Sequence, residues 1–285
     1  MANEQTFASV DSAVAQIWIA EELEALYEEK QVAKEPIIYT QFKEGLVKGD
    51  IVNFSELSTM TVGNVGTDGA VNNQTITHTA RTVTIDQHRE CTVEVVDRAG
   101  AQSVLNYDVI VFRDQAKALG EDMDIGILDD HSSFNGANAI GEPGNPGPMS
   151  LDLALEADQV LWDAKVPGTE PRHWLVAPKA YRQFYNNNLL SSAADSGSPK
   201  SAAVSGKVPD ILGYQVIRTA NVRRVGNPAV HKNLLLARRG VGLAMSIDLN
   251  PEIFRVRKSK QYSTDVLWGE GVLRSNFAVT INSQA

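Results

Sequence analysis

The stretch SVLNYDVIVFRDQAKALGEDMDIGILDDH, residues 103–131, carries the most regular hydrophobic pattern in the chain. Its apolar side chains recur at intervals of three and four residues, which places them on one face of an α-helix. The members of this stripe are Leu105, Val109, Phe112, Ala116, Leu119 and Met123. At about 1.5 Å per residue, such a helix is on the order of 35–40 Å long. The sequence therefore predicts one helix that spans a whole small domain.

The segment in front of this helix is β-rich. The runs IVNFSELSTMTV (51–62) and QTITHTARTVTI (74–85) flank a Gly- and Asn-rich tip (63–73). Apolar and polar residues alternate at 82–85 and again at 92–95, as in strands with one buried face. These patterns predict a long hairpin and a further strand that leads into the helix. Because an isolated hairpin is only marginally stable in water, this one is expected to lie on another surface, for which a neighbouring subunit is the natural support.

Behind the helix, a connector with four glycines and three prolines (132–150) is the best candidate for a domain boundary. Helices and strands then alternate. The sequence predicts a helix at 151–164 capped by Ser150, a strand at 173–177 and a helix opened by Pro178. Residues 191–209, rich in serine and small residues, are expected to form a mobile loop. Further strands are expected at 211–219, 234–238, 241–247, 252–258 and 272–281.

The N-terminal residues 10–30 have the pattern of an amphipathic helix with a strongly acidic end, which is expected to pack as an arm rather than as core. The whole chain of 285 residues has a formal net charge of −9. That charge is unevenly spread, since residues 1–150 carry −15 and residues 151–285 carry +6. A general affinity for nucleic acid is therefore not expected, and halves of opposite sign can pair within one chain or with a neighbour.

Several other functions are excluded by what the sequence lacks. The single cysteine, Cys91, rules out a disulfide within the chain and is expected to be a buried structural thiol. No apolar run reaches the roughly 18 residues of a transmembrane helix. The N-terminus has neither the basic start nor the apolar stretch of a signal peptide. We therefore expect a soluble protein that stays in a reducing compartment.

An acidic cluster at the end of the long helix is the best candidate for a metal site, because carboxylates are the ligands that calcium and magnesium prefer. Its members are Glu121, Asp122, Asp124, Asp129, Asp130 and His131. The spacing departs from an EF-hand, since Gly126 stands where a third ligand belongs. On a helix, Asp122 and Asp129 share a face and Asp124 points elsewhere. A solvated acidic face is the favoured interpretation.

The remaining motifs also fail to make a site. A Gly-x-Gly at Gly240 and Gly242 lacks the third glycine of a dinucleotide fingerprint, where Met245 stands. The five histidines are dispersed. The basic run RVRKSK (255–260) fits a phosphate contact or, equally, a charged edge strand. The sequence thus predicts no catalytic, cofactor-binding or metal-binding residue and indicates a protein that is not an enzyme.

The succession of elements resembles the major capsid protein of tailed bacteriophages, with the Hong Kong 97 fold. The arm-to-hairpin passage WIAEELEALYEEKQVAKEPII…KEGLVKGDIVNF lies within 18–54. The strand pair that leads into the long helix is TVTIDQHRECTVEVVDRAGAQSV (82–104). The third passage joins VPDILGYQVIRTANV (208–222) with NLLLARRGVGLAM (233–245). Together the pattern covers nearly the whole chain.

The resemblance implies an α+β fold with four parts. These are an N-terminal arm (1–35), an extended β-hairpin loop (45–82), a peripheral domain with the long spine helix (83–131 and 240–285) and an axial domain (132–239). It further implies self-assembly through hexamers and pentamers into an icosahedral shell. That shell, assembled in the cytoplasm of a host bacterium, would enclose double-stranded DNA in a virion without sequence-specific binding.

The implied partners are other copies of the chain, a separate scaffolding protein, a portal protein and a candidate decoration protein, with no membrane. The family's covalent crosslink through a lysine in the extended loop is not expected, since no lysine occurs between Lys48 and Lys117. The same fold leaves open an encapsulin-type nanocompartment shell. A metal-dependent enzyme that uses the acids at 121–131 is a remote alternative.

Overall fold

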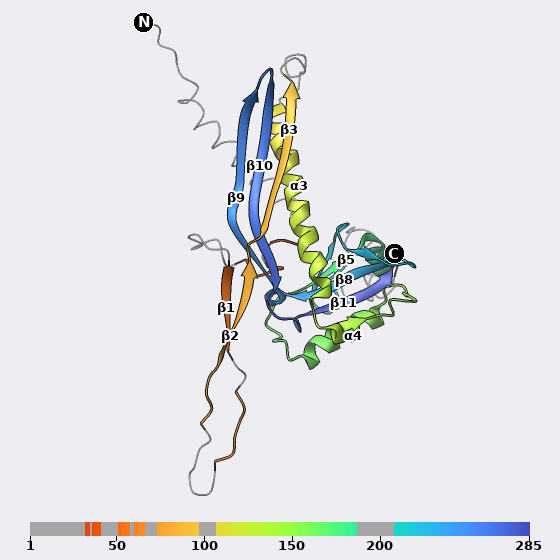
Figure 1. Ribbon diagram of the computed structural model, residues 1–285. Coiled ribbons are helices and arrows are strands. Elements are labelled where there is room, and N and C mark those ends of the chain that lie inside the picture. Colours follow the sequence, from red (N-terminus) through yellow and green to blue (C-terminus); the bar gives the residue numbers. More distant parts are fainter. Residues whose placement is uncertain are drawn as a thin grey trace.

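The computed structural model describes residues 32–34, 36–40, 51–57, 60–65, 73–96, 107–186 and 208–285. The expected arm helix at 10–30, the centre of the hairpin tip and most of the loop expected at 191–209 lie outside these ranges. The described chain forms two larger sheets connected by a long helix, together with a hairpin that projects from them (Figure 1). No helix in the described ranges is long and apolar enough to cross a membrane.

The long helix predicted from the apolar stripe is α3 (Tyr107–Asp129), with 23 residues. Phe112, Ala116, Leu119 and Met123 are all buried, so the periodicity located the packed face correctly. The proposed start at 103 falls outside the described residues. α3 lies along a three-stranded sheet (Figure 1), where the rings of Phe112 and Tyr262 meet edge to face with centroids 5.5 Å apart.

That sheet is antiparallel and has the order β3–β10–β9. Its strands are β3 (Gln87–Val96), β10 (Ser259–Val272) and β9 (Val241–Val256). Two separate strands at 241–247 and 252–258 were predicted, and this is wrong because β9 is continuous over 16 residues. Pro251 interrupts the sequence pattern, but β9 is an edge strand, where a residue without an N–H is tolerated.

β10 was missed altogether, because polar residues on its solvent side mask the alternation. Its inward residues Tyr262, Thr264, Val266 and Trp268 are all buried. Thr264 interrupts the apolar series at its centre and is nevertheless fully buried. Every second residue of this part of β10 is therefore buried, although the sequence does not alternate clearly between apolar and polar residues.

The predicted hairpin is confirmed. β1 (Ile51–Leu57) pairs antiparallel with β2 (His78–Thr84). The base of β2 lies against the backbone of β10 at Gly269. A Cβ added to Gly269 would stand 2.0 Å from the carbonyl oxygen of Thr84, so only glycine permits this approach.

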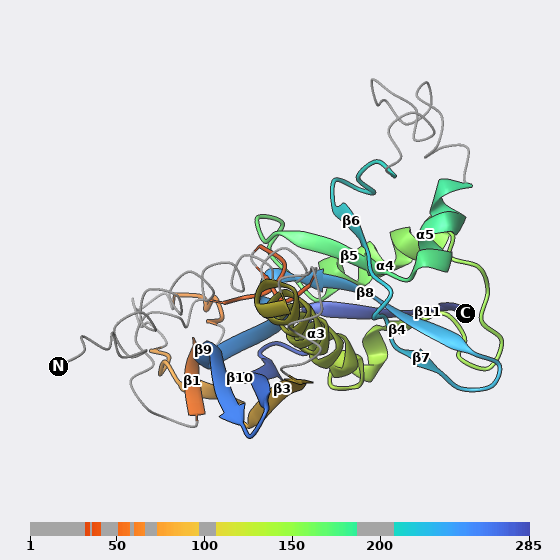
Figure 2. The ribbon, with the colours of Figure 1, turned by 90° about the horizontal axis from the view of Figure 1, so that it is seen from above.

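The second sheet has the order β4–β11–β8–β5–β6, and a short strand, β7 (Arg224–Val225), pairs with β8. Its strands are β4 (Ala139–Ile140), β11 (Ala278–Gln284), β8 (Val230–Ala237), β5 (Arg172–Val176) and β6 (Gln215–Arg218). One face carries Trp174 and Leu235 in a core with α4 (Leu151–Asp163) and α5 (Pro178–Tyr185). The other face carries Leu175 and Leu234 in a core with α3 and β10 (Figure 2).

Both helix starts predicted in this region are confirmed. The Ser150 hydroxyl accepts a hydrogen bond from the Leu153 backbone N–H at 3.2 Å and caps α4. Pro178 is the first residue of α5, where its missing N–H costs nothing.

The predicted end of the chain needs a correction. A single strand at 272–281 was expected, whereas β10 ends at Val272 and β11 begins at Ala278. β11 pairs antiparallel with β8 and parallel with β4. Residues 278–284 therefore lie in the same sheet as strands from 132–239, although the expected division of the chain groups them with the long helix. The reason is that β11 takes its partners from strands that come much earlier in the chain.

Candidate assembly surfaces and an acidic cavity

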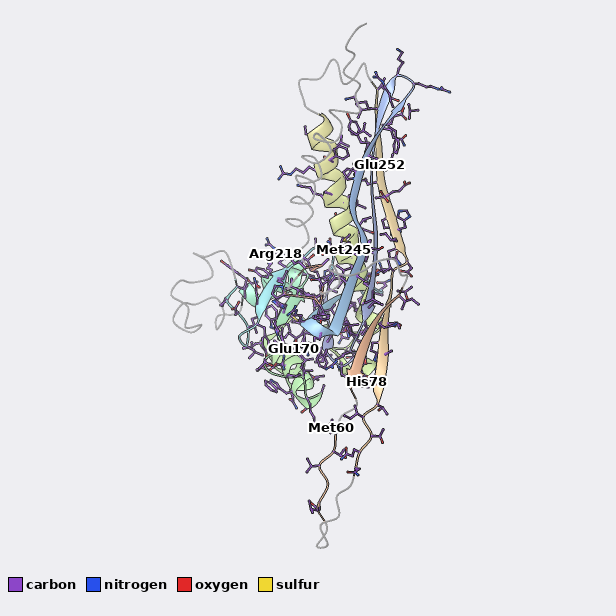
Figure 3. The ribbon with its side chains drawn as sticks, turned by 90° about the vertical axis from the view of Figure 1, so that its left-hand side faces the viewer. Met60, His78, Glu170, Arg218, Met245 and Glu252 are labelled. Carbon is purple, nitrogen blue, oxygen red and sulfur yellow. The ribbon has the colours of Figure 1, made fainter. Side chains whose placement is uncertain are left out.

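The projecting part of the hairpin presents large apolar side chains to solvent. These are Met60, Val62, Val65 and Ile76, each at least half exposed. Figure 3 shows Met60 and His78 on this segment. Beyond the β1–β2 ladder, Gln74 accepts a hydrogen bond from the Thr61 N–H at 2.9 Å and donates one to the Thr61 carbonyl. The two sides of the hairpin are thus kept together by hydrogen bonds. Their apolar side chains are not buried by any described residue.

One buried glutamine fixes α3 to the three-stranded sheet. Gln115 donates hydrogen bonds to the carbonyl oxygens of Cys91 at 2.9 Å and Tyr262 at 3.0 Å. It also accepts one from the Thr264 hydroxyl at 2.9 Å. All three partners satisfy a side chain that is 1% exposed. Sequence reasoning missed this role, and the one available signal was a polar residue beside the apolar stripe.

One buried carboxylate ties the N-terminal segment to α3. Asp124 is 1% exposed and accepts hydrogen bonds from the N–H groups of Val32 at 3.1 Å and Ala33 at 2.7 Å. The prediction that Asp124 points away from Asp122 and Asp129 is confirmed, since those two face a cavity elsewhere on the helix. The described residues contain no group of three or more His, Cys, Asp or Glu arranged to hold a metal ion.

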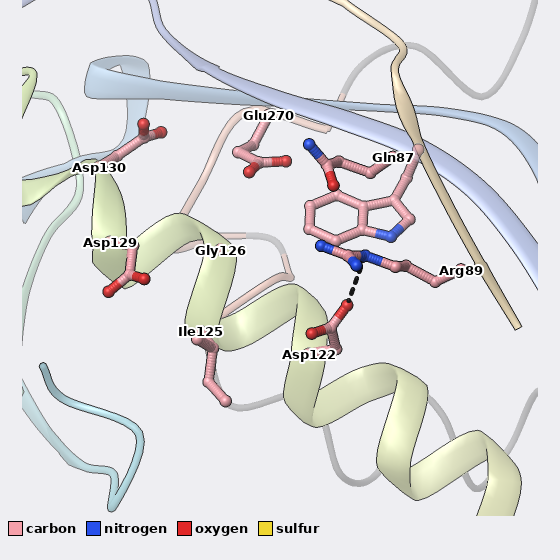
Figure 4. A pocket seen from close by; sticks show the side chains of 9 residues that line it. Gln87, Arg89, Asp122, Ile125, Gly126, Asp129, Asp130 and Glu270 are labelled. Atoms are coloured by element: carbon pink, nitrogen blue, oxygen red, sulfur yellow. Dashed lines mark ion pairs between the residues drawn. The ribbon is translucent and has the colours of Figure 1, made fainter. Parts of the chain in front are cut away.

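That cavity lies between the C-terminal half of α3 and the strands β3 and β10 (Figure 4). It measures about 280 Å³ and is lined by Gln87, Arg89, Asp122, Ile125, Gly126, Asp129, Asp130, Trp268 and Glu270. A Cβ on Gly126 would stand 2.7 Å from the Trp268 indole. The glycine therefore lets the indole pack directly against the helix.

Two of the four carboxylates that line the cavity have cationic partners. Asp122 lies 3.3 Å from the Arg89 guanidinium, and Asp129 lies 3.3 Å from that of Arg223. All four side chains are about half exposed. These pairs are therefore screened by solvent and contribute little to stability.

The other two carboxylates, Asp130 and Glu270, are less well satisfied. Asp130 Oδ2 and Glu270 Oε2 are buried, and no described residue donates a hydrogen bond to either. Burial, helped by the charge of Asp129, raises the pKa of Asp130 to about 6. Burial, followed by repulsion from Asp130, raises the pKa of Glu270 to about 7. The cavity is therefore short of positive charge.

The turn between β9 and β10 has the opposite character. Four exposed cations gather there: Arg255, Arg257, Lys258 and Lys260. Arg257 adopts a left-handed conformation with φ of 56°, which makes the turn tight. The expectation of a charged edge strand holds only for Arg255, which lies in the edge strand β9. Arg257 and Lys258 form the turn, and Lys260 lies in the central strand β10.

The other sequence candidates do not converge. Gly242 lies at the start of β9, after Val241, and no helix follows it, so no dinucleotide turn forms there. His88 lies 3.0 Å from Asp265 on the three-stranded sheet, whereas His173 is buried in the other sheet. Cys91 is half-buried rather than fully buried, and it packs against the main core.

A buried ion pair stabilises the side of the second sheet that faces α4. The Arg172 side chain is fully buried, with Nη1 2.9 Å from both Asp158 Oδ1 and the Tyr214 hydroxyl. Its Nη2 donates to the Val166 carbonyl at 3.0 Å. Its guanidinium also lies 4.8 Å from the ring centroid of Trp162, a residue that is 52% exposed.

Comparisons with known proteins identify the fold. No family model matches the sequence, and no curated protein matches it either. Among solved structures, one from Mycobacterium phage Che8 is 21% identical, with a TM-score of 0.67 over 82% of this chain and 85% of that one. The capsid of Ralstonia phage GP4 is 12% identical, with a TM-score of 0.67 over 91% and 90%.

A third similar structure is the SrpI encapsulin of Synechococcus elongatus, which is 14% identical, with a TM-score of 0.58 over 87% of this chain and 86% of that one. At these identities the likeness establishes the fold. The succession of hairpin, long helix and two sheets is thus the α+β architecture of phage capsid proteins and encapsulins, and this chain has the Hong Kong 97 fold.

Proposed function

We propose that this chain is the major capsid protein of a tailed bacteriophage. It self-assembles through hexamers and pentamers into an icosahedral shell around double-stranded DNA. Its work is structural, done by interfaces summed over many copies, and it needs no catalytic residue or cofactor. The protein would reside in the virion after assembly in the cytoplasm of the host bacterium.

The observation that carries this proposal is the hairpin. A two-stranded ribbon with Met60, Val62 and Val65 in solvent is costly for a lone subunit, because exposed apolar surface is unfavourable in water. A neighbouring copy that receives the ribbon removes this cost. The shell-forming fold supplies such a neighbour.

The parts of the chain then take their roles in the shell. The arm comprises 1–35 and the extended loop comprises 45–82. The peripheral domain consists of the spine helix and the three-stranded sheet. The axial domain comprises 132–239 together with β11. A scaffolding protein, a portal protein and a decoration protein are the further partners that a phage shell of this kind would use.

The net charge of −9 suits this function, since a shell has to enclose DNA at high density without adhering to it. The relevant charge is that of the inner surface of the assembly. We expect DNA to be enclosed and not bound to specific sequences.

Electron microscopy of the expressed protein, with and without a co-expressed scaffolding protein, tests the proposal. Closed shells, rings or tubes are expected. A protein that circular dichroism shows to be folded but that remains monomeric in every condition would contradict the proposed shell function.

The second candidate is an encapsulin-type shell, favoured by the similarity to the SrpI encapsulin. The two functions differ in contents. Particles purified from the native source and treated with nuclease should retain protected double-stranded DNA if the shell is a phage capsid. Particles that hold a folded cargo enzyme and no DNA would establish the encapsulin instead.

A further inference from the structure

The acidic cavity plays no part in the hairpin contact between copies. It combines two buried carboxylate oxygens that lack a donor with a buried indole that lacks an acceptor. Trp268 is 2% exposed, and no described residue accepts a hydrogen bond from its Nε1. An occupant that satisfies all three groups must bring positive charge and at least one hydrogen-bond acceptor.

A polypeptide turn with a basic side chain meets both needs, because its cation can pair with the carboxylates and a carbonyl oxygen can accept from the indole. A bare metal ion supplies the positive charge but no hydrogen-bond acceptor. The cavity volume of about 280 Å³ far exceeds the roughly 10–15 Å³ that one water requires, so the end of a long side chain has room. Ile125, 37% exposed at the lining, offers an apolar contact for the stem of such a side chain.

The chain itself carries a turn of this kind. At the β9–β10 tip, neither Arg257 nor Lys258 has an ion pair with any described residue. Phe254 and Val256, both at least 40% exposed, stand directly before them. The tip therefore combines basic and apolar side chains, and the cavity combines acidic and apolar ones, so the two surfaces are complementary.

The tip of a subunit cannot reach its own cavity. Lys258 directly precedes β10 and Glu270 lies near the other end of that strand, so at about 3.3 Å per residue they are roughly 40 Å apart. Figure 1 shows the tip at one end of the three-stranded sheet and the C-terminal end of α3 at the other. A contact between them must join two copies.

Resting on the proposed shell function, we propose that the β9–β10 tip of one subunit docks into the acidic cavity of another. Arg257 or Lys258 enters beside Asp130 and Glu270, and a carbonyl of the turn accepts from Trp268 Nε1. Two different patches meet, so the contact is heterologous and can be repeated from copy to copy around a ring or across a shell.

The contact also removes a cost that the lone subunit bears. Without a cation, ionising either carboxyl group is unfavourable. Burial and the charge of Asp129 raise the pKa of Asp130 to about 6, and burial and the charge of Asp130 raise the pKa of Glu270 to about 7. A cationic side chain lowers both. Docking is therefore expected to strengthen as the pH rises from about 5 to 8.

Crosslinking tests the contact directly. In a Cys91→Ser background, Lys258→Cys is combined with Ile125→Cys, assembled and treated with a short bis-maleimide. Covalent dimers and longer ladders are expected on a denaturing gel. The matched control combines Ile125→Cys with Lys165→Cys, an exposed lysine just after α4, and should give none. Assembled particles in which the Lys258 pair gives no more product than the control would overturn the proposal.

Charge substitutions test its energetic importance. Arg257→Glu with Lys258→Glu should lower shell yield about tenfold or more, since a cation is replaced by an anion facing carboxylates. Lys165→Glu with Arg224→Glu, which changes the net charge equally, should leave the yield within about twofold. Adding Glu270→Lys to the tip variant should restore assembly. Should that triple variant not fold by circular dichroism, Asp122→Lys at the half-exposed rim takes its place.

The remaining outcomes separate the two proposals. Suppose that the wild-type protein assembles and that the tip variant and its charge-matched control give the same shell yield. This result would overturn the docking contact and leave the shell function standing. Wild-type protein that never assembles would overturn both. Yield should not change when EDTA is added, and a requirement for magnesium or calcium would assign the cavity to a metal ion and overturn the docking.

Discussion

At the scale of single residues, the described chain holds a few buried polar groups whose partners come from distant positions. Gln115 is fully satisfied by three hydrogen bonds and stabilises the contact between helix and sheet. Glu270 and Asp130 are not satisfied, and they mark a place where the folded subunit is strained electrostatically. Buried groups of the first kind stabilise the fold, whereas those of the second kind need something from outside.

Glu270→Gln should stabilise the unassembled subunit at high pH and not at low pH. The pKa of Glu270 is raised to about 7 from 4.5, so the folded state holds its proton more tightly than the unfolded state. Stability is therefore lost as the pH rises through 4.5 to 7, and a neutral amide avoids this loss. Urea unfolding should give equal free energies near pH 4 and a gain on the order of 1 kcal/mol at pH 8, discounted for partial exposure.

The matched control is Glu90→Gln on the opposite face of the same sheet. It should shift the unfolding midpoint equally little at both pH values. A Glu270 variant that shows no pH-dependent gain would mean that the carboxyl group is solvated in the folded subunit.

Arg172→Met should destabilise the subunit by about 3–5 kcal/mol, because it leaves Asp158 and the Val166 carbonyl without their buried donor. Thermal unfolding measures the effect. Arg239→Met is the control, since that guanidinium is 57% exposed in its ion pair with Glu170. It should cost less than about 1 kcal/mol. Equal losses in the two variants would contradict a special role for burial at Arg172.

At the scale of elements, α3 and the hairpin behave in opposite ways. α3 buries its predicted stripe against the sheet and is stabilised within the subunit. Among the described residues, the hairpin is anchored at its base, where Val83 packs with Ala244 and Leu273. Its outer part contributes apolar surface and little core, so its value lies in contacts that one subunit cannot make.

Deleting residues 58–75 should therefore leave the subunit folded and impair assembly. The thermal midpoint of the unassembled protein should change by no more than a few degrees, because no buried residue of the described core is removed. Shell yield, counted by electron microscopy, should fall sharply. A deletion variant with normal shells would mean that the hairpin is not a clamp between copies.

At the scale of the whole molecule, the two sheets share one core. Leu175 and Leu234 of the six-stranded sheet belong to the same buried cluster as Met123 of α3 and Trp268 of β10. Cooperative unfolding of both sheets follows from this continuity. The charge asymmetry belongs to this scale as well, since −15 and +6 in the two halves suit heterologous contacts between copies.

Leu161→Ala, in the core that α4 forms with the six-stranded sheet, should weaken both sheets equally. The expected loss is about 2–5 kcal/mol from the cavity that it creates. Hydrogen exchange should report the same loss for slow amides of β8 and of β10. Leu155→Ala on the same helix, 48% exposed, should cost far less. A loss confined to β8 would show that the two sheets unfold independently.

The sequence alone determined the elements whose signal is local. The apolar stripe of α3, the hairpin runs and the starts of α4 and α5 are read within a few turns of chain, because side-chain periodicity and capping depend on near neighbours. The order of these elements was enough for the resemblance to a capsid fold.

Only the tertiary structure decided what depends on residues far apart in the chain. β11 joins a sheet whose other strands precede it, and β9 continues through Pro251 because it is an edge. The cavity exists because Asp130 and Glu270, 140 positions apart, are brought together by the packing of α3 on β10. No local pattern encodes such a meeting, since its energy comes from contacts that exist only once the chain has folded.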